Sequence, residues 1–322
     1  MQQTNEILSI EKEIQKKKKK MPLSRKIFII SMIIYPIIHF LVFWLYVNVD
    51  SIFMAFQDFN YFEEKEVFVG LENFKWTLDE LYRMGKSDLI NCIKNSVLLF
   101  LSNNFVILPI SIFCAYIFYK KVPGHKIFKV IFFLPNIISV VVLTLAFSFM
   151  FNTSFGPVNE VLKWIGLESV IPANGWFSDK NSAFIMVLIY CLWAGIGYNV
   201  VLLSGAIGRI PEEVIESGKL DGIGMWKELF LIVVPLIFPT ITTLFVTGVT
   251  VIFTLFLQPM LLTGGGPYNH ISGTISLFIV ELVNSSNLYK AAAVGLLFSL
   301  VGVPLVQIVK IIFEKISPDV EY

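Results

Sequence analysis

The charged residues most able to act together lie in one loop, at positions 210–224, between two long apolar stretches. The loop holds four acids close together: Glu212, Glu213, Glu216 and Asp221. Pro211 suits the first position of a helix, the acids suit its positive end, and Gly222 suits its termination. Because a short helix is marginal alone in water, the pattern favours a helix that packs on a partner protein. The alternative, a solvated acidic face, has the same composition.

Catalysis and metal binding have weaker support in the sequence. The three histidines fall in different segments without ligand-like spacing, and three cysteines cannot form a complete disulfide framework. The complete phosphate-loop pattern G-x-x-x-x-G-K-S/T is missing. The net charge of +1 gives no overall field toward nucleic acid. We therefore expect no catalytic residue, metal or cofactor in this chain and no nucleic-acid partner.

The elements that position the loop are expected to be transmembrane helices. Of 322 residues, 56% are hydrophobic and 15% are charged, which is more apolar than a soluble domain can bury. A spanning helix needs about 20 apolar residues, and six segments qualify: 27–49, 96–119, 127–151, 183–207, 229–263 and 291–313. The fifth would be about 50 Å long as one helix, and two prolines interrupt it, so its span is expected to begin near Phe238. The predicted fold is an all-α, polytopic helical membrane protein with about six transmembrane helices.

Basic residues set the expected orientation, because they accumulate on the cytoplasmic side of a membrane. Lysines crowd the leader and the turn between the second and third spans, which places both termini and the loop at 208–235 inside. The chain then divides into a basic cytoplasmic leader (1–26), a retained first span (27–49), an external loop (50–90), a permease-like domain (91–315) and a cytoplasmic tail (316–322). A short apolar run at 271–283 predicts an amphipathic helix on or near the outer surface.

The loop also matches a known pattern. Glu216-Ser217-Gly218, three residues, Gly222, nine more residues and Ile232-Val233-Val234-Pro235 resemble the EAA motif of the inner-membrane permeases of binding-protein-dependent ABC importers. The family pattern is Glu-Ala-Ala, three residues, Gly, nine residues, Ile, one residue and Leu-Pro. The spacing fits throughout, whereas Ser217, Gly218 and Val234 replace the family's Ala, Ala and Leu.

A second stretch extends this resemblance. Residues 261–267, Leu-Leu-Thr-Gly-Gly-Gly-Pro, followed by Thr274, Leu277 and Ala291-Ala292-Ala293, look like the end of the permease domain in the carbohydrate branch, the maltose and glycerol-phosphate type. The resemblance covers about residues 91–315 and implies a type I permease fold in the bacterial plasma (inner) membrane. It also implies import of a sugar or sugar-like solute by alternating access.

The resemblance implies partners as well. These are a second homologous permease, an extracytoplasmic solute-binding protein and a cytoplasmic ATPase dimer, which would use the ATP and Mg that this chain does not bind. In such importers the loop helix sits in a cleft of the ATPase. The residues expected to dock there are Glu213, Glu216, Ser217, Gly218, Asp221 and Gly222.

Two predicted spans carry faces that could line a solute path. In the fifth span a polar stripe lies within about an 80° arc: Thr240, Thr243, Thr247, Thr250, Thr254 and Gln258. These groups could replace water around an uncharged polyol or bond their own helix backbone, and both interpretations stay open. In the fourth span one face combines Gly195, Tyr198, Asn199 and Leu202. The resemblance favours Gly195 and Tyr198 there, and in the fifth span Gly248, Ile252 and Leu255, although this last face is mostly apolar.

Two other classes of protein are alternatives. A secondary transporter or channel usually carries ionisable residues inside its spans, where this sequence offers essentially His39 and Lys310. An intramembrane enzyme needs convergent acids, bases or metal ligands, and the spans supply none. Both classes fit the sequence less well than a permease that is driven by a separate ATPase.

Overall fold

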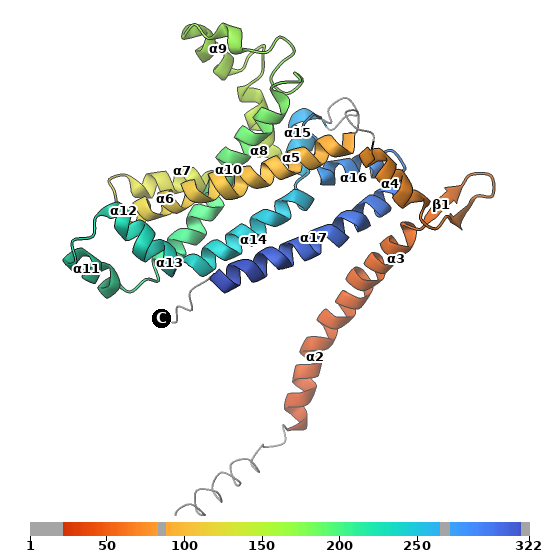
Figure 1. The fold of residues 1–322 in the computed structure, drawn as a ribbon, viewed down its shortest axis with the longest axis horizontal. Coiled ribbons are helices and arrows are strands. Elements are labelled where there is room, and N and C mark those ends of the chain that lie inside the picture. Colours follow the sequence, from red (N-terminus) through yellow and green to blue (C-terminus); the bar gives the residue numbers. More distant parts are fainter. Residues whose placement is uncertain (1–21, 83–87, 265–270, 317–322) are drawn as a thin grey trace, which may run out of the picture. The chain divides into compact units, whose positions relative to one another are not determined.

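The structure, a computed structural model, describes residues 22–82, 88–264 and 271–316 and is mostly helical (Figure 1). In these ranges four helices are long and apolar enough to cross a membrane, and the number rises to six if each of two bent helix pairs is one span. The predicted helical membrane fold with about six spans is therefore confirmed. By internal packing the chain divides into two units, Met1–Phe53 and Met54–Tyr322.

The first unit holds the first predicted span. α2 (Leu23–His39), η1 (Phe40–Tyr46) and α3 (Val47–Met54) continue one another as a helix of 32 residues. All of these residues are described and none is buried, so large apolar side chains such as Phe43 and Trp44 are exposed. A helix with this much exposed apolar surface needs lipid or other helices around it.

Two long helices of the second unit pack along each other. α5 (Asp88–Ser102), the π-helical η2 (Asn103–Ile107) and α6 (Leu108–Tyr119) are continuous and make the second span. α10 (Ala183–Ile207) is the fourth span and packs along α6. Fully buried side chains such as Leu203 fill the contact, so α6 and α10 hold each other in place.

The third predicted span is broken. α7 (His125–Ile137) and α8 (Val140–Met150) meet at an angle of 108°. Pro135 lies inside α7, and Ile138 and Ser139, which follow the helix, are extended with ψ of 141° and 135°. The expectation of one continuous helix over 127–151 was therefore wrong, because the chain leaves the helical conformation three residues after the proline.

The fifth span bends where its prolines indicate. Three short elements precede the bend: α12 (Met225–Glu228), η4 (Leu229–Val233) and α13 (Val234–Leu236). The longer helix α14 (Phe238–Thr254) follows it. The bend is 75°, and α14 begins at Phe238 as predicted, with Pro239 in its first turn. However, α14 ends at Thr254, and a separate helix, α15 (Leu257–Thr263), follows it. Gln258 thus does not extend the threonine stripe along one helix.

The predicted short helix near the outer surface exists as α16 (Ile275–Asn284), but it packs into the bundle. Its first turn is buried against α5, α14 and the last span, α17 (Leu288–Ile316). Nδ2 of Asn95 donates to the carbonyls of Ile271 (2.8 Å) and Gly273 (2.9 Å) just before the helix. These polar contacts replace the water that a helix on the surface would have.

The structure also contains elements that the sequence patterns did not predict. They are a hairpin of β1 (Gln57–Asn60) and β2 (Lys65–Phe68), helix α4 (Glu72–Tyr82), helix α9 (Pro157–Trp164) and the short 3₁₀ helix η3 (Glu168–Val170). The strands are antiparallel, with Gln57 opposite Phe68. Nδ2 of Asn73 in α4 donates to the carbonyls of Ala55 (3.2 Å) and Gln57 (2.8 Å), which fastens α4 to the hairpin. The hairpin is a departure from the all-α expectation.

Candidate functional site

The loop that is predicted to meet a partner contains the expected short helix, α11 (Glu212–Leu220). Gly222 follows it with a left-handed φ of +73°. The amide of Ile223 donates to the carbonyl of Gly218 (3.1 Å), and the amide of Gly222 donates to that of Lys219 (3.0 Å). These two bonds form the Schellman arrangement that closes a helix at a glycine. Local hydrogen bonds therefore end α11 where the sequence indicated.

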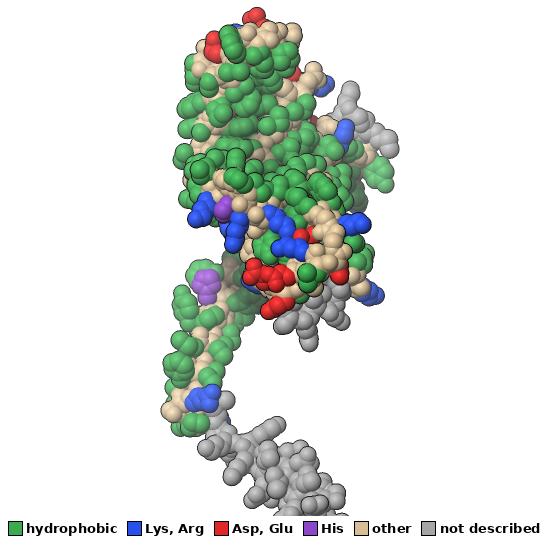
Figure 2. Space-filling model, turned by 90° about the vertical axis from the view of Figure 1, so that its left-hand side faces the viewer, with side chains coloured by type: hydrophobic (Ala, Val, Ile, Leu, Met, Phe, Trp, Pro, Cys, Tyr) green, Lys and Arg blue, Asp and Glu red, His purple; other side chains and the backbone are tan. Residues whose placement is uncertain are grey.

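α11 turns its acids outward and two small or aliphatic residues inward. The exposed residues are Glu212, Glu213, Glu216, Ser217, Asp221 and Gly222. Ile215 and Gly218 are buried, and a Cβ on Gly218 would lie 2.6 Å from Cδ1 of Ile232. Figure 2 shows charged side chains gathered at this end of the unit, below a mostly hydrophobic surface. The acidic face of α11 is thus open to a partner.

A buried ion pair joins α12 to the end of α6. Glu228 is 4% exposed, and its Oε1 lies 2.5 Å from Nζ of Lys120. Lys120 is one of the lysines of the turn that indicated the orientation of the chain, and Glu228 is not among the predicted site residues. The sequence did contain a signal for Glu228. This acid directly precedes an apolar run, and an acid that is buried there needs a partner.

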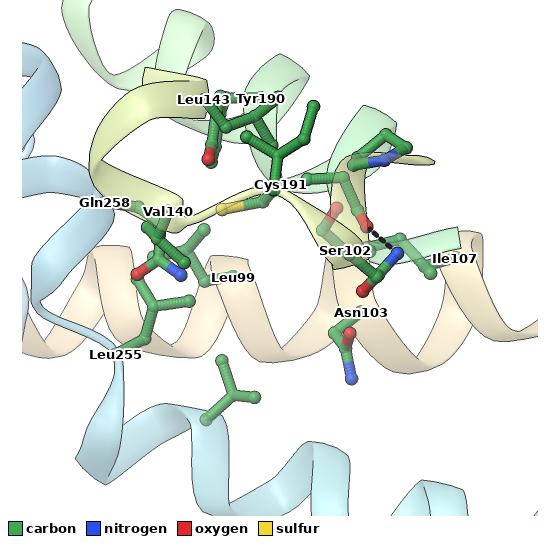
Figure 3. Close-up of a pocket in the computed structure, with 16 residues that line it drawn as sticks. Leu99, Ser102, Asn103, Ile107, Val140, Leu143, Tyr190, Cys191, Leu255 and Gln258 are labelled. Atoms are coloured by element: carbon green, nitrogen blue, oxygen red, sulfur yellow. Dashed lines mark hydrogen bonds between the residues drawn. The ribbon is translucent and has the colours of Figure 1, made fainter. Parts of the chain in front are cut away.

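The membrane-spanning part of the second unit contains a cavity of about 260 Å³ (Figure 3). Three amide side chains and one serine hydroxyl, each from a different element, line it: Asn103, Asn136, Gln258 and Ser102. Nδ2 of Asn136 donates to the carbonyl of Ala194 (3.2 Å). The remaining lining is largely apolar and includes Leu143 and Tyr190. Such a mixture suits a ligand that has both hydroxyl groups and apolar faces.

The structure brings only some of the predicted path residues to this cavity. Gly195 and Leu255 line it, as does Gln258. Tyr198 is 52% exposed and Asn199 is buried on α10, and neither belongs to the lining. The sequence reasoning missed Asn103 and Asn136, although an amide inside an apolar run is a recognisable signal.

Gly248 shapes the same region through its lack of a side chain. A Cβ at this position of α14 would lie 2.6 Å from Nδ2 of Asn103 and 2.5 Å from Nδ2 of Asn104. α14 therefore packs directly on η2, and Oδ1 of Asn104 is buried without a hydrogen-bond partner. π-helical segments are frequent at functional sites, and this one supplies Asn103 to the cavity.

The threonine stripe of α14 bonds its own backbone. The hydroxyls of Thr243, Thr247, Thr250 and Thr254 donate to Pro239, Thr243, Thr247 and Thr250 carbonyls at 3.0, 2.8, 2.7 and 2.9 Å. Thr250 and Thr254 line a different hollow of about 410 Å³ between α14 and α17. The geometry thus favours the backbone interpretation, and a role of the stripe in a solute path stays a prediction.

Metal ligands do not gather in the described part of the chain. No group of three or more His, Cys, Asp or Glu side chains there is placed to hold an ion. The glycines and proline of the second sequence match, at 265–267, lie outside the described residues. The two features whose geometry suits binding are the acidic face of α11 and the cavity.

Comparison with known proteins finds the same class throughout. Residues 107–321 match the family described as binding-protein-dependent transport system inner membrane component. The chain is 30% identical over 255 residues to a probable ABC transporter permease protein, YurN of Bacillus subtilis (strain 168), covering 75% of this chain and 81% of YurN.

A second relative and a solved structure extend this likeness. The arabinooligosaccharides transport system permease protein AraP of Halalkalibacterium halodurans is 27% identical over 270 residues, covering 82% of this chain and 81% of AraP. The fold is similar to a chain in the crystal structure of a bacterial ABC transporter involved in the import of the acidic polysaccharide alginate. The TM-score is 0.79 at 24% identity, with 92% of this chain and 98% of that chain covered.

Proposed function

The chain belongs to the family of binding-protein-dependent transport system inner membrane components, so it is a multi-pass permease of an ABC importer, and we propose that it imports an uncharged sugar or sugar-like solute. The observation that carries this proposal is the cavity of about 260 Å³. Its polar lining consists of amides and hydroxyls, and none of its lining side chains is Asp, Glu, Lys, Arg or His. Amides can exchange hydrogen bonds with sugar hydroxyls.

The relatives support a sugar as the solute, and the lining of the cavity favours an uncharged one. AraP is named as a permease of an arabinooligosaccharides transport system. The transporter of similar fold is involved in the import of alginate, an acidic polysaccharide. An acidic sugar needs cationic groups on its path, because an unpaired carboxylate in an apolar cavity is costly. The lining of this cavity offers no cation, which favours a neutral saccharide over a uronate polymer.

The family and the exposed surfaces also support a proposal for the partners. A binding protein delivers the solute outside, and this chain pairs with a second, homologous permease. A cytoplasmic ATPase dimer uses ATP and Mg and receives the acidic face of α11, with Glu213 and Glu216 as its charged contacts. The lysines between α6 and α7 support a cytoplasmic position for this loop and for both termini, because basic residues accumulate on that side of a membrane.

The solute assignment is tested on the assembled transporter in proteoliposomes. Asn103→Ala and Gln258→Ala each remove one hydrogen-bonding amide, so solute-stimulated ATP hydrolysis should fall roughly two- to tenfold at a fixed solute concentration. The matched control is Thr254→Val. Thr254 does not line the cavity, so this substitution should leave the solute-stimulated ATP hydrolysis unchanged. Neutral oligosaccharides should stimulate hydrolysis and uronate oligomers should not. The reverse preference, or an effect of Thr254→Val alone, would reject the assignment.

The docking assignment has its own test. Glu216→Lys places a cation on the open face of α11 without touching its buried side, so the chain should insert normally but lose its ATPase during purification in mild detergent. Glu160→Lys is the control, because Glu160 is also exposed but belongs to a different helix, α9. Normal uptake by membranes that contain the Glu216→Lys chain would count against docking through α11.

A further inference from the structure

Three side chains at the end of α6 face α12. Phe113, Tyr116 and Lys120 have the spacing i, i+3 and i+7, which places them on one face of a helix. The Phe113 ring stacks on Trp226 at 5.4 Å between centroids, with 6° between the ring planes. The Tyr116 hydroxyl donates to the Met225 carbonyl (3.2 Å).

The third contact is the ion pair between Lys120 and Glu228. Unlike the ring stacking and the hydrogen bond, it requires two charged groups to leave water. The Glu228 side chain is 5% exposed and that of Lys120 is 25% exposed. Nζ of Lys120 also lies 5.3 Å from the centroid of the Tyr116 ring. Removing two charges from water is expensive and often adds no net stability, so such a pair is better understood as a constraint on geometry.

α11 and η4, the segment that continues α12, share one packed cluster with α6. Ile215 of α11 belongs to the same group of buried side chains as Tyr116 of α6 and as Leu229 and Val233 of η4. α6 in turn continues without interruption into η2, whose Asn103 lines the cavity. A continuous physical connection therefore runs from the exposed acids of α11 to the cavity.

We propose that the Lys120–Glu228 ion pair is a positioning contact that makes α6 follow α12 when the ATPase displaces α11. The inference rests on the proposed function, because it assumes that α11 is where the ATPase acts. Displacement of α11 can bias the cavity only through contacts that differ between two states. The ion pair joins α12 to the end of α6, and α6 is continuous with η2, which carries Asn103.

The decisive variant replaces the pair rather than breaking it. Lys120→Met with Glu228→Leu removes both charges, leaves no unpaired buried charge and should therefore preserve folding. We expect this chain to keep its ATPase and its basal ATP hydrolysis, while solute uptake per ATP hydrolysed falls by about tenfold. The reversed pair, Lys120→Glu with Glu228→Lys, should recover much of the lost uptake. A merely structural pair would not change the ratio of uptake to hydrolysis.

The control uses an exposed ion pair of the same kind. Lys310 and Glu314 lie 3.7 Å apart on α17 with side chains 50% and 57% exposed, and replacing them by Met and Leu should leave the ratio unchanged. An unchanged ratio in the Lys120→Met, Glu228→Leu chain would overturn the inference alone. Failure of the unaltered chain to copurify with an ATPase would overturn the proposed function together with it.

Discussion

Gly197 of α10 lies so close to the carbonyl oxygen of Phe132 in α7 that a Cβ atom on the glycine would overlap it. The same Cβ would lie 2.6 Å from Nδ2 of Asn136. Because the nearest obstacle is backbone, it cannot move aside as a flexible side chain would. Gly197→Ala should therefore force α7 away from α10 and lower the free energy of unfolding by about 1–3 kcal/mol, measured by thermal unfolding in detergent.

The matched control for this substitution lies on the same helix. A Cβ on Gly205 would meet nothing within 4 Å, so Gly205→Ala should be neutral or stabilise α10 by up to about 1 kcal/mol through helix propensity. Equal stability of the two variants would show that α7 and α10 are not in direct backbone contact at Gly197.

Thr274 joins α16 to the end of α14. Its hydroxyl donates to the carbonyl of Leu255 (2.5 Å) and accepts from the amide of Leu277 (3.3 Å), which caps the helix. Thr274→Ala removes both bonds and should lower the free energy of unfolding by about 1–2 kcal/mol. Thr274→Ser keeps the hydroxyl and should retain most of the stability of the unaltered chain. Because Leu255 lines the cavity, uptake should fall with Thr274→Ala as well. A fully stable Thr274→Ala chain would contradict the role of this cap.

Local signals predicted the parts of the structure that local chemistry decides. Pro239 marked the beginning of α14, because a proline lacks the donor that only the first turn of a helix can spare. Gly222 marked the end of α11, because a left-handed residue must follow it there. Both features are settled within a few residues of the chain, and the sequence alone therefore predicted them.

The cavity could not be predicted in the same way. Asn103, Asn136 and Gln258 belong to three different elements, and they meet only because α7 breaks from α8 and α14 ends at Thr254. The stripe hypothesis assumed that α14 continues to Gln258. Leu255 instead adopts an extended ψ of 110°, and its carbonyl is held by Thr274. Contacts between distant segments thus decided what periodicity had left open.

Gly218 stands where the EAA motif has alanine, and the structure shows what an alanine there would meet. The added Cβ would lie 2.6 Å from Cδ1 of Ile232, the far end of a flexible side chain. Ile232 can turn away at small cost, while the helix gains up to about 1 kcal/mol of propensity. Gly218→Ala should therefore keep its ATPase during purification. Gly222→Ala is the contrasting variant, since its φ of +73° is strained for alanine and should shift α11. Loss of the ATPase from Gly218→Ala alone would show that Ile232 cannot adapt.

Glu281 of α16 gives the stability of the fold a dependence on pH. Burial, with a smaller contribution from the charge of Asp88, raises the pKa of its carboxyl from 4.5 to about 7. Between these values the folded chain binds a proton that the unfolded chain has lost, so stability should fall as pH rises through this window. Glu281→Gln removes the titration and should raise the unfolding temperature more at about pH 8 than at about pH 5. The unaltered chain, measured at both pH values, is the reference for each gain. If the Glu281→Gln chain gains equally at both pH values, the carboxyl does not titrate in this window.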